Sequence, residues 1–145
     1  MAGPDLQRRV ARHVYVDLAV LKLHSEELLR RCQAAVRRAE GQLTDPGDLV
    51  HWDYTTANIL ARGDEITGVV DWDGVCNGDR LFDLVTLYYY TRTQSLRDYV
   101  AERLRPAVLA AYLAAMVVRQ VAYSLKFHSP DAAPGLIEDG LELTA

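Results

Sequence analysis

Length, composition and charge place this chain among globular proteins of ordinary make-up. It has 145 residues, of which 50% are apolar and 25% are charged, and its formal net charge is −4. A negative balance argues against a nucleic-acid binder, because such proteins usually present a basic face. No stretch reaches the roughly eighteen apolar residues of a membrane span, and the N-terminus has no apolar signal core. We therefore expect a single cytoplasmic domain over residues 1–145, with neither nucleic acid nor membrane as a partner.

The cysteines and the arginine pairs carry little functional information. Cys32 and Cys76 lie far apart and without metal-ligand spacing, which predicts two reduced thiols rather than a disulfide framework. Three arginine pairs recur at helical spacing, and we interpret them as a solvated helix face, the alternative being a docking site for anions. These pairs are Arg8–Arg9, Arg30–Arg31 and Arg37–Arg38.

The first part of the chain is predicted to be helical. Apolar residues recur at helical spacing over residues 6–21 and again over residues 28–39. Ser25 precedes two glutamates and has the character of an N-cap, so the two stripes are either two helices or one bent helix. Residues 44–48 have the composition of a turn.

The centre of the chain changes to strand periodicity. Residues 49–50 form a short apolar strand that leads into a loop, and residues 58–62 and 65–70 are predicted to pair as a hairpin with a two-residue turn at Gly63. Asn58 starts this hairpin and Asp71 ends it. Because both ends of a hairpin arrive at the same edge, the two side chains can share one ion.

The remainder of the chain is again predicted to be helical. We expect a helix after Asp79, a short helix capped by Ser95, a long helix from Pro106 to about Phe127, and a last helix over residues 135–143. The predicted fold class is mainly α with a small β-hairpin (α+β).

The central segment carries the residue types that phosphoryl transfer from a nucleotide requires. Asp53 is positioned to accept a proton from a hydroxyl, and Asn58 and Asp71 offer two oxygens to Mg²⁺. Taken singly, each of these residues could equally serve a turn or a cap. As one spaced set they favour a catalytic site.

This set resembles the aminoglycoside phosphotransferase and choline kinase family, an offshoot of the protein-kinase-like fold. The matching segments are His51-Trp-Asp53, Asn58, Val70-Asp71-Trp72-Asp73 and Gly78-Asp79-Arg80…Asp83-Leu84. The resemblance implies a kinase-like large (C-terminal) lobe with the catalytic loop at 49–60, the metal-binding strand end at 68–73 and helices over 79–143. It also implies ATP or GTP and Mg²⁺ as cofactors.

The resemblance assigns roles to individual residues. It implies that Asp53 is the base, that Asn58 and Asp71 are metal ligands, and that His51 fixes the catalytic loop by hydrogen bonding or acts directly in the chemistry. Trp52 departs from the glycine that the family usually has at this position and adds bulk beside the base.

Three further acidic residues follow this set. Asp73, two residues past Asp71, is a further candidate metal ligand, with capping of the next turn as the alternative. Asp79 and Asp83 are expected to cap the following helix rather than to contact substrate.

No segment before His51 has the features that bind nucleotide phosphates in kinases. The glycines there, Gly3, Gly41 and Gly47, stand apart from one another, so a glycine-rich loop is absent from this stretch. We therefore expect that this chain is the large lobe without its N-terminal lobe and that it is inactive alone. It would then need a separate small lobe, or it would self-associate.

Several readings of function stay open. The leading one is transfer of a γ-phosphate to the hydroxyl of a small molecule such as an aminoglycoside, a choline-like amine or a sugar. The first alternative is a non-catalytic lobe that binds a cationic small molecule or a partner protein. The second is a metal-dependent hydrolase that uses Asp53, Asp71 and Asp73.

Overall fold

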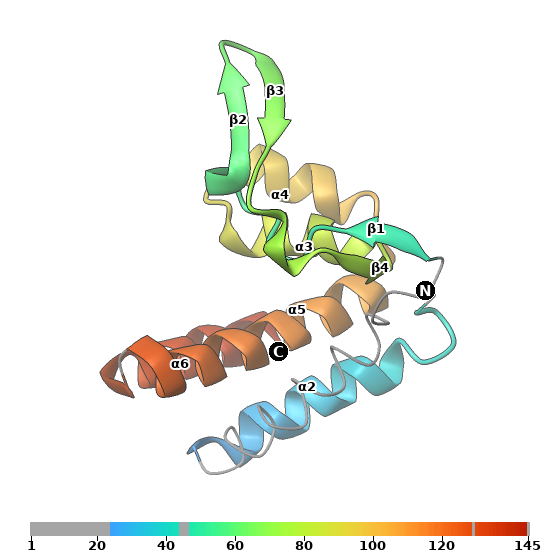
Figure 1. The fold of residues 1–145 in the computed structure, drawn as a ribbon. Coiled ribbons are helices and arrows are strands. Elements are labelled where there is room, and N and C mark those ends of the chain that lie inside the picture. Colours follow the sequence, from blue (N-terminus) through green and yellow to red (C-terminus); the bar gives the residue numbers. More distant parts are fainter. Residues whose placement is uncertain (1–23, 44–46, 129, 145) are drawn as a thin grey trace. The chain divides into compact units, whose positions relative to one another are not determined.

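The computed structural model describes residues 24–43, 47–128 and 130–144 (Figure 1). The chain divides into two compact units. Among the described residues, unit 1 comprises residues 47–104, and unit 2 comprises residues 24–43 and 105–144. Together, the described residues of both units form five α-helices and two antiparallel sheets of two strands each.

The mainly helical fold class with a small β component is confirmed. The single domain over residues 1–145 stays a prediction, and the helix expected over residues 6–21 lies outside the described residues.

Unit 2 consists of three helices that pack together, α2 with α5 and α6, and α5 with α6. Their bounds are Glu26–Arg38 for α2, Pro106–Tyr123 for α5 and Ala133–Leu143 for α6. The Ser25 hydroxyl accepts a hydrogen bond from the Leu28 N–H at 3.2 Å, so the predicted cap of α2 is confirmed. Pro106 occupies the first turn of α5, as expected for a residue without an N–H. One π-helical turn, Ser124–His128, continues α5.

The core of unit 2 depends on close approach of its helices. In α2 the side chains of Leu28, Cys32 and Ala35 are buried at helical spacing. Gly140 of α6 is buried, and a Cβ atom built on it would lie 2.5 Å from Cγ1 of Val117 in α5 and 3.2 Å from Cδ1 of Leu28. Glycine at position 140 therefore lets α6 pack directly against its two neighbours.

The apolar α5 segment also meets the length and composition criteria for a membrane span. Among the described residues, Pro106–Phe127 is the one helix that does so, and 56% of its most apolar window is buried inside the structure. The mostly buried core helix of a soluble protein can have the same length and composition. The observation is therefore weak evidence for a span.

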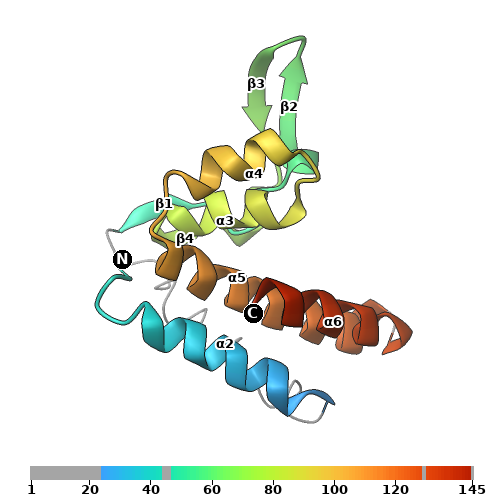
Figure 2. The ribbon, with the colours of Figure 1, turned by 180° about the vertical axis from the view of Figure 1, so that it is seen from behind.

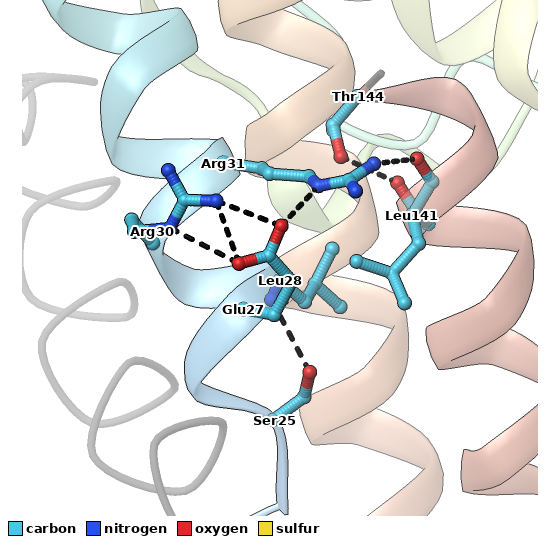
Figure 3. Close-up of polar contacts among 8 residues, drawn as sticks. Ser25, Glu27, Leu28, Arg30, Arg31, Leu141 and Thr144 are labelled. Carbon is cyan, nitrogen blue, oxygen red and sulfur yellow. Dashed lines mark hydrogen bonds and ion pairs between the residues drawn. The ribbon is translucent and has the colours of Figure 1, made fainter.

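A polar contact also joins α2 to α6 (Figure 3). Arg31 donates from Nε to Glu27 at 2.7 Å and from Nη1 to the carbonyl oxygen of Leu141 at 2.9 Å. That carbonyl lies in the last turn of α6, where helix carbonyls lack partners within the helix. Arg30 also binds Glu27, and the hydrogen bonds from Arg31 and Arg30 lower the pKa of the Glu27 carboxyl. Arg31 is thus an interhelical residue rather than part of a wholly solvated face.

Unit 1 contains both sheets and two helices. The bounds are Asp48–Val50 for β1, Ile59–Arg62 for β2, Glu65–Val69 for β3, Cys76–Gly78 for β4, Leu81–Tyr90 for α3 and Gln94–Ala101 for α4. The β2–β3 hairpin is the one that the sequence predicts, and Gly63 supplies a positive φ of 65° in its two-residue turn. Within unit 1 the hairpin projects away from α3 and α4 in both views (Figures 1 and 2).

The strand predicted at residues 49–50 is confirmed as β1, but the sequence does not predict its partner, β4. β1 pairs antiparallel with β4, with Val50 opposite Cys76 and Asp48 opposite Gly78. β4 has only three residues, which is too short for a periodic pattern to be recognised in the sequence. Through this pairing, the segment that follows β3 lies beside β1, the strand that precedes β2 in the sequence.

The two helices of unit 1 begin differently from one another. The Asp79 carboxylate accepts a hydrogen bond from the Leu81 N–H at 2.9 Å, so its predicted capping of α3 is confirmed. The predicted cap at Ser95 is wrong, because α4 already begins at Gln94 and Thr93 precedes it. The side-chain amide of Gln94 donates to Asp98 at 2.7 Å, a contact one turn apart that supports this earlier start.

We predict that Gly140→Ala destabilises unit 2 by about 1–3 kcal/mol, because the new methyl group would overlap Val117 and Leu28. Chemical unfolding followed by circular dichroism measures the loss. Gly135→Ala is the matched control in the same helix, since its Cβ would meet nothing within 4 Å, and it should be neutral or slightly stabilising. Equal effects of the two substitutions would contradict the close packing of α6.

We also predict that the Cys32 thiol is unreactive in the native protein. Burial raises its pKa to about 11, so only about one thiol in a thousand is ionised near pH 8. Labelling by a disulfide reagent in a Cys76→Ala variant should be slow in buffer, should accelerate as the pH rises toward 11, and should become rapid in denaturant. Rapid labelling of the native variant near pH 8 would contradict this burial.

Candidate functional site

The candidate site lies on two loops of unit 1. Loop A comprises residues 51–58, between β1 and β2, and loop B comprises residues 70–75, between β3 and β4. Because β1 pairs with β4 and β2 pairs with β3, the two loops are held opposite each other at both ends. The Val70 N–H donates to the Asn58 carbonyl oxygen at 3.0 Å, which continues the β2–β3 ladder to the point where the loops begin. Asn58 and Asp71 therefore stand at the same end of the hairpin.

His51 connects loop A to loop B. Its side chain is buried, and Nε2 lies 2.8 Å from the carbonyl oxygen of Val70. Since a carbonyl only accepts, we assign the proton to Nε2. The His51 ring also lies 4.6 Å from the ring of Trp72, whose Nε1–H donates to the Val69 carbonyl at 2.8 Å. The two carbonyls before Asp71 thus each accept a hydrogen bond from an aromatic side chain.

Asp83 anchors loop A to α3. Its Oδ2 accepts from the His51 backbone N–H at 2.7 Å, and its Oδ1 accepts from the Trp52 backbone N–H at 3.0 Å. The expectation that Asp83 caps the helix is therefore wrong. It lies in the first turn of α3, but its carboxylate reaches two amides that lie about thirty residues earlier in the chain. The only sequence signal for this role is its place in the Gly78…Leu84 segment.

Opposing effects act on the Asp83 carboxyl group. Burial raises its pKa, because the charged form loses water, while the hydrogen bonds from the His51 and Trp52 amides lower it. Burial is the larger effect, so the pKa lies above its ordinary value. A carboxylate that is partly removed from water is normally stabilised by hydrogen-bond donors. For Asp83 these donors are backbone N–H groups of loop A.

Asp53 and Asn58 contact each other directly. The side-chain amide nitrogen of Asn58 donates to the Asp53 carbonyl oxygen at 2.9 Å and to Asp53 Oδ2 at 3.2 Å. Because this amide nitrogen faces Asp53, the amide oxygen of Asn58 keeps its lone pairs for another ligand. The pair thus combines an oriented carboxylate with a neutral oxygen donor.

Asp71 and Asp73 lie on loop B and are exposed. Asp71 adopts the left-handed conformation, with φ of 63° and ψ of 59°. This region is uncommon for residues other than glycine, although Asp tolerates it, and such conformations gather at functional sites. Asp73 follows in the 3₁₀ turn Trp72–Gly74.

The donor set fits a hard divalent cation. Asn58 and the two aspartates of loop B offer oxygen atoms only, which Mg²⁺ prefers, and Mg²⁺ commonly completes its shell with phosphate and water. In the part of the chain that the structure describes, no three His, Cys, Asp or Glu side chains form a group that could hold a metal. Any cation here would therefore depend on the amide of Asn58 and on oxygens from a bound molecule.

Trp52 also has a left-handed backbone, with φ of 77°. For a bulky residue this conformation costs about 1–2 kcal/mol. The Trp52 ring stacks on the buried ring of Phe82, with centroids 4.9 Å apart and planes 17° apart. Contacts with α3 thus offset the cost of this backbone.

We predict that Asp83→Asn destabilises unit 1 by about 1–3 kcal/mol, because an amide accepts through one oxygen only and turns an N–H toward a backbone donor. Both tryptophans, Trp52 and Trp72, lie in unit 1, so urea unfolding followed by their fluorescence reports on this unit. Asp98→Asn, on the exposed surface of α4, is the matched control and should change stability by less than about 0.5 kcal/mol. An Asp83→Asn midpoint equal to that of the control would contradict the anchoring role.

The chain matches one family model, described as the phosphotransferase enzyme family (APH), over residues 2–122. No curated protein and no solved structure matches it. The family match covers most of the chain and includes both loops. The chain therefore belongs to the APH phosphotransferase enzyme family.

Proposed function

We propose that this chain contributes the catalytic lobe of a small-molecule phosphotransferase, which transfers the γ-phosphate of ATP or GTP to a hydroxyl group. The observation that carries the proposal is the juxtaposition of loops A and B. It places the Asp53–Asn58 pair beside the strand end that bears Asp71. Membership of the phosphotransferase family supports the same reaction class.

In this proposal Asp53 is the catalytic base. Its carboxylate accepts the proton of the acceptor hydroxyl while the hydroxyl oxygen bonds to the γ-phosphorus, and the bond from phosphorus to the β–γ bridging oxygen breaks to release the nucleoside diphosphate. The Asn58 amide orients that carboxylate through the 3.2 Å hydrogen bond. His51 acts by position, because its ring joins loop A to the Val70 carbonyl just before Asp71.

Asn58 and Asp71 would hold Mg²⁺, with Asp73 as a further ligand. When bound, this ion neutralises charge on the nucleotide phosphates. The left-handed backbone and exposure of Asp71 support a ligand role, since a strained residue at a loop that faces solvent is typical of a functional site.

The acceptor class is a small molecule with a hydroxyl group, such as an aminoglycoside, a choline-like amine or a sugar. We further propose that residues 1–145 correspond to the large lobe of a protein-kinase-like fold. In kinases of that fold, a small lobe binds the nucleotide phosphates together with the large lobe.

We predict that Asp71→Ala weakens Mg²⁺-dependent ATP binding at least about tenfold, because it removes a charged oxygen ligand. Calorimetric titration of ATP with and without Mg²⁺ measures this effect. Asp64→Ala, in the exposed turn of the β2–β3 hairpin, is the matched control for loss of an acidic residue in the same unit and should bind as the parent does. Binding that ignores Mg²⁺, or equal losses in the two variants, would contradict the assignment of Asp71.

A further inference from the structure

We propose that Trp52 is a positioning residue that holds loop B against loop A and so sets the place of Asp71 and Asp73 relative to Asp53. This inference rests on the proposed function for its consequence in catalysis. The contacts that carry it are independent of any activity. They join Trp52 to two elements, α3 and loop B.

On one side, α3 binds both the backbone and the ring of Trp52. The Trp52 N–H donates to Asp83 Oδ1 at 3.0 Å, and its ring stacks on Phe82, which is 2% exposed. Phe82 and Asp83 are consecutive residues in the first turn of α3. A left-handed conformation at a bulky residue persists only where the surroundings determine it, and these two contacts do so.

On the other side, Trp52 lies against the backbone of Gly74 in loop B. A Cβ atom built on Gly74 would lie 3.0 Å from Cδ1 of Trp52 and 3.1 Å from its Cβ. These distances are tighter than most carbon contacts, so a methyl group at position 74 would displace the Trp52 side chain by a few tenths of an ångström. Gly74 closes the 3₁₀ turn in which the Val75 N–H donates to the Trp72 carbonyl at 3.1 Å.

The Trp52 side chain therefore links a helix to the turn that follows Asp71. Contacts with α3 fix the indole, and the fixed indole in turn packs against Gly74. Loop B also contains Asp73 within the same turn. The Trp52 side chain has no oxygen to offer a metal and is not a base, so its effect on chemistry would act through the placement of loop B.

Hydrogen exchange of the native chain tests this link without any ligand. Trp52→Ala should accelerate exchange of the Val75 amide, whose hydrogen bond to the Trp72 carbonyl closes the turn in loop B, about tenfold or more, while the hairpin of β2 and β3 keeps the parent rate. Trp52→Phe, which retains a ring for stacking, should restore most of the protection. Unchanged exchange in loop B, or a uniform increase over residues 47–104, would overturn the proposal, because the first shows no link and the second shows a merely structural role.

A glycine pair provides the second arm. Gly74→Ala should accelerate loop B exchange in the parent but add nothing in the Trp52→Ala background, where the obstructing side chain is gone. Gly68→Ala is the matched control, since its Cβ would lie at an ordinary 3.7 Å from Leu60 and should leave loop B unchanged. Additive effects of Gly74→Ala and Trp52→Ala would overturn the proposed contact.

Mn²⁺ affinity separates this inference from the proposed function. If the parent binds Mn²⁺ with ATP, Trp52→Ala should weaken that binding about tenfold and Trp52→Phe should not. If the parent binds no Mn²⁺, the proposed function fails, and the exchange experiment still decides whether Trp52 holds loop B. Parent-like Mn²⁺ affinity in Trp52→Ala would overturn the positioning role.

Discussion

The carboxylate of Asp83 accepts hydrogen bonds from two consecutive backbone amides, those of His51 and Trp52, and the rest of the candidate site depends on this contact. A loop has few hydrogen bonds of its own, so its conformation must be determined by what it contacts. Here a helix provides the acceptor, and the acceptor is charged and half-buried, which makes the bonds strong and their loss costly. The start of loop A is thereby attached to α3.

The orientation of the candidate catalytic groups follows from that attachment. With its backbone held, His51 directs Nε2 to the Val70 carbonyl and so connects loop A to the end of β3. At the other end of loop A, Asn58 binds Asp53 through its side chain and Val70 through its carbonyl. The two sheets hold the remaining ends of the loops. Two short ladders and a few side-chain bonds are thus sufficient to bring residues 53, 58 and 71 into one region.

Local signals in the sequence predicted much of this structure. Ser25, Pro106 and Gly63 each act within a few residues of their own position, and the helix starts and the hairpin turn follow from them. What the sequence did not predict depends on distant partners. The β1–β4 pairing joins two strands of three residues, and the role of Asp83 depends on amides far from it in the chain. The left-handed backbone of Trp52 likewise accompanies contacts with Phe82 and Gly74, which lie more than twenty residues away in the chain.

The most direct test of the central claim is to find which residues lie close to a bound metal ion. Asn58 and Asn77 are the only asparagines, so two side-chain amide signals report on two positions of unit 1 in a nuclear magnetic resonance spectrum. Mn²⁺ added with a non-hydrolysable ATP analogue should broaden the Asn58 signal at substoichiometric concentration and affect the exposed Asn77 signal much less. Equal broadening of both signals, or none at either, would contradict a metal site formed by Asn58 and Asp71.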